Sequence, residues 1–124
     1  MGLARPGDIL VIDRLGDTRF ACLGDGVAAA AKLPGVRGEI IYGPCTDGEA
    51  LAELGFPVWC RGLSPMTTRM AGLGGRAHVA VSVGGVAVLA GDSLLADADG
   101  AYAVRPDDAA RVAPLALTRG RIVA

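Results

Sequence analysis

The sequence has little of what catalytic and metal sites are most often built from. Among its 124 residues are one histidine and three cysteines, and aromatic residues make up only 4%. Cys22, Cys45 and Cys60 lie far apart in the sequence and form no CxxC pair, so we expect no structural zinc site. No serine lies in a GxSxG elbow and no cysteine lies near His78, so no motif predicts covalent catalysis.

Clustered charge and long apolar runs are also missing. The formal net charge is -1 and no run of Lys and Arg occurs, so we expect no direct contact with nucleic acid. No apolar run approaches the roughly 20 residues that span a bilayer. The first residues lack the pattern of a secretory signal, and an odd number of thiols suits a reducing compartment. We therefore expect a cytoplasmic protein that makes no contact with the membrane.

What the sequence does have is small apolar residues and glycine. Hydrophobic residues make up 52% and charged residues 20%, and there are 19 glycines. This balance is typical of an α/β protein built from small side chains and tight turns. The length suits one domain with its own core and is too short for two ordinary domains. We therefore expect a single domain over residues 1–124.

The first half of the sequence alternates between strand-like and helix-like segments. The predicted strands cover residues 9–12, 19–23, 38–43 and 56–60. The predicted helices cover residues 26–33 and 46–54, and the second has a capping box of Thr46 and Glu49 at its start and Gly55 at its end. Strands that alternate with helices in this way are typical of parallel βαβ units.

The second half predicts hairpins and a closing helix. A loop over residues 63–76 is followed by short β runs at 78–83, 86–89 and 92–104, which glycine turns separate. The last helix begins at Pro106, and Pro114 is expected to weaken it.

Two glycine-containing motifs in this half predict turns rather than sites. GLGGR at residues 72–76 lacks the preceding strand and the Lys-Ser/Thr of a phosphate-binding P-loop. GDSLLADADG at residues 91–100 lacks the closing glutamate of a calcium-binding EF-hand loop, and apolar residues interrupt it.

Two carboxylates, Asp25 and Asp47, have two possible roles. Each precedes a predicted helix, where a side-chain oxygen accepts hydrogen bonds from the first backbone N–H groups. Local capping therefore explains both residues without any function. The alternative is that both carboxylates face one shared pocket.

Four ordered blocks of the sequence resemble one known family. RPGDILVID at residues 5–13, the stretch over 24–51, LAELGFPVWCRGLSP at 51–65 and VSVGGVAVLAGDSLLADADGAYAVRP at 81–106 are similar, in order and spacing, to the RraA-like family. That family contains the regulator of ribonuclease activity A and the class II 4-hydroxy-4-methyl-2-oxoglutarate aldolases. The resemblance implies a swivelling β/β/α domain that assembles as a homotrimer or a hexamer, with active sites between subunits.

The resemblance also assigns roles to individual residues. The family's enzymes carry an aspartate, twenty intervening residues and then Arg-Asp, and they use Mg²⁺ or Mn²⁺. Here Asp25 is followed by twenty residues and then by Thr46-Asp47, so the spacing is kept and the arginine is replaced. By the resemblance, Asp47 anchors the metal and Asp25 orients metal-bound water. Arg61 and Arg76 are the candidates to supply the missing positive charge.

The family's helix-entry loop corresponds to Gly26, Val27 and Ala28, whose backbone amides are expected to hold the substrate's carboxylate. Helix N-termini attract anions, so this placement is physically reasonable. The sequence departs from the family at Tyr42, where an aspartate is usual, and no acidic residue follows Asp108. Relatives have a further helical segment before the first strand, so the resemblance implies either a family member shortened at its N-terminus or a natural chain of which a part is absent from this sequence.

The resemblance implies a divalent-metal-dependent aldolase or decarboxylase that releases pyruvate from a small 2-keto diacid such as oxaloacetate or 4-hydroxy-4-methyl-2-oxoglutarate. Thr46 offers a hydroxyl group without charge, so the electrostatic contribution of the arginine is reduced. Two alternatives follow. One is a non-catalytic oligomeric binding protein that modulates ribonuclease E, and the other is a structural subunit of a larger assembly.

Overall fold

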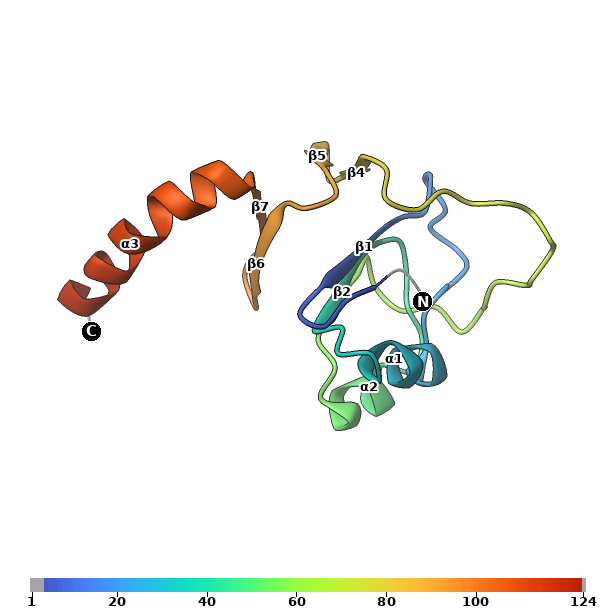
Figure 1. Ribbon diagram of the computed structural model, residues 1–124. Coiled ribbons are helices and arrows are strands. Elements are labelled where there is room, and N and C mark those ends of the chain that lie inside the picture. The colour runs from blue at the N-terminus through green and yellow to red at the C-terminus, as the bar shows by residue number, and fades with distance from the viewer. Residues whose placement is uncertain (1–3, 124) are drawn as a thin grey trace.

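A three-stranded sheet with two helices leads into two hairpins and a long helix in the computed structural model, which describes residues 4–123, with side chains as far as Thr118 (Figure 1). The strands are β1 (Ile9–Asp13), β2 (Gly38–Tyr42), β3 (Val58–Trp59), β4 (Val81–Val83), β5 (Val86–Val88), β6 (Ser93–Asp97) and β7 (Gly100–Val104). The helices are α1 (Asp25–Lys32), α2 (Gly48–Leu54) and α3 (Pro106–Val123). None of the described helices is both long enough and apolar enough to span a membrane.

The first half forms the predicted parallel βαβ units. The sheet has the order β1-β2-β3, and β1 pairs with β2 from Ile9 opposite Gly38 to Asp13 opposite Tyr42. Both helices lie side by side against the same part of the sheet (Figure 1). The α/β class and the helix–strand alternation predicted from the sequence are confirmed.

The core lies between the sheet and the two helices, and small side chains form its α1 face. Ala28 and Ala31 of α1 are fully buried, with no exposed surface. Alanine at these positions lets the helix backbone approach the sheet closely, and packing at such short range leaves no room for larger groups. The larger core side chains are Leu23, Val36, Ile41, Leu51 and Phe56.

The strand predicted at residues 19–23 is wrong. Asp17 Oδ1 accepts hydrogen bonds from the backbone N–H groups of Arg19 (2.9 Å) and Phe20 (3.1 Å), which folds this segment into a turn. The same backbone hydrogen bonds hold the pKa of Asp17 below its ordinary value. Only Ala21 forms a β-bridge, with Thr67.

The capping box predicted for α2 is also wrong. The helix begins at Gly48, and its N-cap residue is Asp47, in the left-handed region at φ 57° with no side-chain capping bond. The C-terminal prediction is confirmed, because Gly55 adopts φ 65° and donates its N–H to Ala52 O. The Asp47 carboxylate instead accepts a hydrogen bond from Asp25 N–H, at the start of α1.

The second half forms two antiparallel hairpins, β4–β5 and β6–β7, and then α3, which leads away from the sheet (Figure 1). The indole N–H of Trp59 donates to Asp97 O (2.7 Å) and joins the second hairpin to β3. Pro114 lies within α3 and does not end it. The described side chains of α3 are almost all exposed.

Candidate functional site

The carboxylate of Asp47 lies at the N-terminus of α1. Its Oδ2 accepts a hydrogen bond from the backbone N–H of Asp25 (3.3 Å), 22 residues earlier in the chain. Gly24 permits this approach, since a methyl group there would overlap Asp47 Oδ2 and press on the Thr46 side chain. The structure therefore brings Asp25, Thr46 and Asp47 into one place, the Asp25/Asp47 site.

The backbone around the site follows from the sheet. The chain leaves β1 and reaches Leu23, whose carbonyl accepts a hydrogen bond from Thr46 N–H (2.9 Å) in the segment after β2. Both segments follow the carboxyl ends of neighbouring parallel strands. Ligands of open α/β sheets bind outside these ends. The Asp25/Asp47 site therefore lies where a ligand is expected.

The three backbone amides that the sequence predicts to bind a carboxylate differ in whether their N–H groups are free to donate to a ligand. The N–H of Ala28 donates to Gly24 O (3.0 Å) as the first bond of the helix. The N–H of Gly26 donates to Asp25 Oδ1 (2.7 Å). For Val27 the structure shows no hydrogen-bond partner of the N–H among the described residues, so this amide is the free donor at the N-terminus of α1.

Neither candidate arginine supplies charge to Thr46 in this structure. The guanidinium of Arg61 stacks on the ring of Tyr42, 4.7 Å from its centroid. Arg76 lines a cavity whose lining includes neither Thr46 nor Asp47. Within residues 4–118, where side chains are described, no ion pair involves Asp25 or Asp47. Both carboxylates are exposed and unpaired with a cation.

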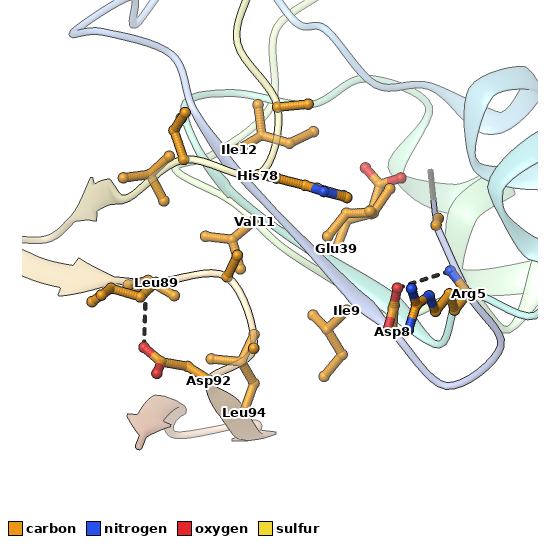
Figure 2. A pocket seen from close by; sticks show the side chains of 18 of the residues that line it. Arg5, Asp8, Ile9, Val11, Ile12, Glu39, His78, Leu89, Asp92 and Leu94 are labelled. Carbon is orange, nitrogen blue, oxygen red and sulfur yellow. Dashed lines mark hydrogen bonds between the residues drawn. The ribbon is translucent and has the colours of Figure 1, made fainter. Parts of the chain in front are cut away.

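A cavity of about 950 Å³ lies between β1, the segment around His78 and the turn before β6 (Figure 2). Its lining reaches Leu23 and Val27, so the cavity adjoins the Asp25/Asp47 site. Its lining includes Glu39 and does not include Asp25 or Asp47. Figure 2 shows the His78 ring and the Glu39 side chain directed into the same space. His78 adopts φ 58°, an uncommon conformation for a residue with a side chain.

Glu39 is a buried carboxyl that sequence reasoning missed. Its side chain is 1% exposed, and Oε2 has no hydrogen-bond partner among the described residues. Burial raises the pKa of Glu39 from 4.5 to about 7, because desolvation disfavours the charged form. The sequence feature that could have identified Glu39 is a charged residue within the otherwise apolar strand GEIIY.

This pKa predicts that the protein becomes less stable as pH rises. A carboxyl whose pKa is raised on folding binds more protons in the folded state, so its stability contribution is present below pH 4.5 and is lost as pH rises through about 7. We expect the free energy of unfolding to fall by at most about 3 kcal/mol over this window. Glu39→Gln removes that part of the pH dependence.

The measurement is urea unfolding at several pH values for the native protein and Glu39→Gln. The exposed Glu49→Gln is the matched control and should follow the native curve. Parallel native and Glu39→Gln curves would show that Glu39 keeps an ordinary pKa.

The donor set available for a metal is small. Among the described residues, no group of three or more His, Cys, Asp or Glu side chains is arranged to hold a metal ion. The Asp25/Asp47 site offers carboxylate oxygens only. Mg²⁺ is commonly held by one or two carboxylates and keeps several waters, so two exposed carboxylates fit such an ion better than zinc.

Comparison with known proteins places the chain among related sequences. A model of the RraA-like family, described as Aldolase/RraA, matches residues 1–102. A protein of Halalkalibacterium halodurans with the provisional name 4-hydroxy-4-methyl-2-oxoglutarate aldolase is 40% identical over 97 residues, which are 78% of this chain and 46% of that protein.

Two solved structures share the fold. RraAS2 of Streptomyces coelicolor, described as an unusual member of the RNase ES inhibitor RraA protein family, has a TM-score of 0.84 and 34% identity. The match covers 97% of this chain and 61% of that one. The RNA-processing inhibitor RraA from Thermus thermophilis has a TM-score of 0.73 and 32% identity, over 81% of this chain and 62% of that one. The chain thus spans about half to three fifths of the length of these proteins.

Proposed function

Because this chain belongs to the RraA-like family, we propose that it binds a divalent metal ion and a small 2-keto diacid at the Asp25/Asp47 site and releases pyruvate from that acid. The observation that carries the proposal is the position of the Asp47 carboxylate beside the N-terminus of α1. Oxaloacetate and 4-hydroxy-4-methyl-2-oxoglutarate are the proposed substrates.

The metal is proposed to be Mg²⁺ or Mn²⁺, held by Asp47 with Asp25 beside it. Asp47 is exposed, and among the described residues its carboxylate accepts one hydrogen bond, from Asp25 N–H, so oxygen lone pairs remain for an ion. When bound, such an ion acts as a Lewis acid that polarises the keto group of the substrate.

The N-terminus of α1 is proposed to hold the substrate's carboxylate. Val27 contributes its free N–H, and the positive end of the helix dipole favours an anion at this position. Gly26 adds its N–H when the Asp25 side chain turns away to its proposed role of orienting water. Ala28 shapes the helix entry, since its own amide is bonded to Gly24 O.

Thr46 makes the proposed reaction slow. A fixed cation beside the reacting group stabilises negative charge that develops in the transition state, and a hydroxyl group provides a single weaker donor. Arg61 is held against Tyr42 and does not replace the charge. We therefore expect binding of metal and keto acid to be kept better than turnover.

The first test is pyruvate formation from oxaloacetate and from 4-hydroxy-4-methyl-2-oxoglutarate, with Mg²⁺, with Mn²⁺ and with EDTA. We expect slow turnover above the metal-only background, abolished by EDTA and saturable in substrate. Rates equal to those of the free metal ion would contradict catalysis by this chain. Mn²⁺ binding is measured separately by the electron paramagnetic resonance of the ion. This measurement distinguishes loss of the metal site from loss of catalytic turnover.

A second candidate function is non-catalytic binding to a ribonuclease of the E type. Thr46 in the place of the arginine favours it, and two structural relatives are described as inhibitors of RNase ES or of RNA processing. The test is a pull-down with this chain as bait. Recovery of a ribonuclease of the E type, in equal amounts with the native chain and with Asp47→Asn, would support this candidate. It would also separate the binding surface from the Asp25/Asp47 site.

We also propose that the chain acts in the cytoplasm as one domain over residues 1–124 that assembles into a homotrimer or a hexamer. Apolar side chains remain exposed along the second half, among them Tyr102 (72%), Leu115 (62%) and Leu117 (66%). Exposed apolar surface of this kind is typical of association sites. Light scattering of the purified chain tests this, and a monomer at all concentrations would favour an obligate partner chain.

A further inference from the structure

Cys45 and Cys60 form a pair of thiols in direct contact. Their Sγ atoms lie 3.0 Å apart, although the residues are 15 positions apart in the chain. Both are free cysteines, as is Cys22. A disulfide bond needs the two sulfurs at about 2.05 Å, so a movement of about 1 Å is enough to form one.

The backbone on both sides of the pair is already fixed. Gly62 O accepts a hydrogen bond from Cys45 N–H (3.1 Å) and one from Cys60 Sγ (3.2 Å). The carbonyl of Cys45 accepts a bond from Ser64 N–H (2.9 Å). The two sulfurs therefore meet because the chain after β2 and the chain after β3 are held together, and their contact does not depend on a flexible loop.

The pair lies next to the Asp25/Asp47 site. Cys45 directly precedes Thr46, whose N–H is bonded to Leu23 O, and Asp47 follows with its carboxylate at the N-terminus of α1. Asp47 adopts a left-handed backbone conformation that its surroundings must maintain. Two peptide bonds separate Cys45 from Asp47, so a shift of the Cys45 backbone on bond formation would reach both Thr46 and Asp47.

We propose that Cys45 and Cys60 are a site of reversible covalent modification, at which a small disulfide such as oxidised glutathione converts the pair into an intramolecular disulfide that displaces Thr46 and Asp47. Formation of the bond is independent of the function proposed above. Only its effect on metal binding depends on that function.

The exchange begins at Cys60. Cys45 is buried and Cys60 is half-buried, so Cys60 is the more accessible thiol. Its thiolate attacks oxidised glutathione, one glutathione thiol leaves, and Cys60 carries a mixed disulfide. The Cys45 thiolate then attacks the Cys60 sulfur and releases the second glutathione thiol. In total the two protein thiols are oxidised, and one glutathione disulfide is reduced to two thiols.

The burial of Cys45 sets the order of the two steps. Cys45 is 3% exposed, so its thiol is screened from solvent and meets the Cys60 sulfur beside it. A glutathione adduct on Cys60 therefore appears before the intramolecular bond.

The test incubates the full chain with defined ratios of oxidised and reduced glutathione, blocks free thiols and identifies the products by mass spectrometry. Cleavage after Glu49 and Glu53 separates the two cysteines, so the disulfide appears as two joined peptides. We expect joined peptides in the native chain and in the matched control Cys22→Ser. Cys45→Ser should stop at the Cys60 adduct, and Cys60→Ser should give no joined peptide.

The effect on the site is measured by amide hydrogen exchange over residues 43–48, which needs no metal or substrate. We expect at least about a tenfold change in the exchange rate of the Thr46 amide on oxidation, reversed by reductant. The fall in Mn²⁺ affinity that accompanies it reports on the proposed function separately. Adducts without joined peptides, or joined peptides with unchanged Thr46 exchange, would each overturn the proposal.

Discussion

Thr46→Arg raises the rate of metal-dependent pyruvate release by about 100-fold or more. The replacement puts a fixed positive charge next to Asp47, at the position where the family's enzymes carry their arginine. One preorganised donor to a developing negative charge is worth about 3 kcal/mol, which corresponds to about this factor. The gain should appear in kcat more than in KM, because the charge acts mainly in the transition state.

The backbone at position 46 is fixed beside Asp47. Thr46 is half-buried and donates its N–H to Leu23 O, so the new side chain starts from a held position next to the exposed Asp47. Thr46→Gln is the matched control, since it adds length and polarity without charge. Equal gains in both variants would point to shape rather than charge, and no gain in Thr46→Arg would argue against a surviving lyase site.

Asp47→Asn lowers the affinity for Mn²⁺ by at least about 100-fold. Mutation of a residue that only supports a metal ligand lowers metal affinity by about 10–100-fold. Mutation of the carboxylate that anchors the metal should lower the affinity at least as much. Asparagine keeps the shape of the side chain and can still accept the hydrogen bond from Asp25 N–H, so the fold should be retained. Paramagnetic resonance of free Mn²⁺ measures the affinity, and circular dichroism checks the fold.

Alanine substitutions at two glycines at the start of α1 test whether the position of the Asp47 carboxylate matters for Mn²⁺ binding. A methyl group at Gly24 would overlap Asp47 Oδ2, whereas a methyl group at Gly26 meets nothing within 4 Å. Gly24→Ala should therefore displace the Asp47 carboxylate and weaken Mn²⁺ binding by about tenfold or more. Gly26→Ala should leave it unchanged. If the two variants bind Mn²⁺ equally, the carboxylate does not anchor the metal from this position.

Much of the fold could be predicted because its signals are local. Apolar runs bounded by glycine predicted β1 and β2, the Ala-rich run predicted α1, and paired glycines predicted the hairpin turn between β4 and β5. Each of these depends on propensities of residues that are neighbours in the chain. The family resemblance, carried by four ordered blocks, likewise needed only the order and spacing of residues.

The wrong predictions have one physical cause, which is that a polar side chain has more than one possible partner. Asp17 uses its oxygens on the amides of Arg19 and Phe20 and turns a predicted strand into a bend. Asp47 was expected to cap α2, and instead its carboxylate accepts a bond from the start of α1. The local sequence identifies an oxygen that can cap a helix, but it does not determine which helix that oxygen caps.

By itself, the sequence determined the α/β class, the order of the first strands and helices, the family and the spacing of Asp25 and Asp47, because these depend on neighbours in the chain. Tertiary structure decided that Asp47 faces the N-terminus of α1, that Glu39 is buried without a partner, and that Cys45 meets Cys60. These three features depend on how β1, β2 and β3 pair, since strand pairing brings together residues that are distant in sequence.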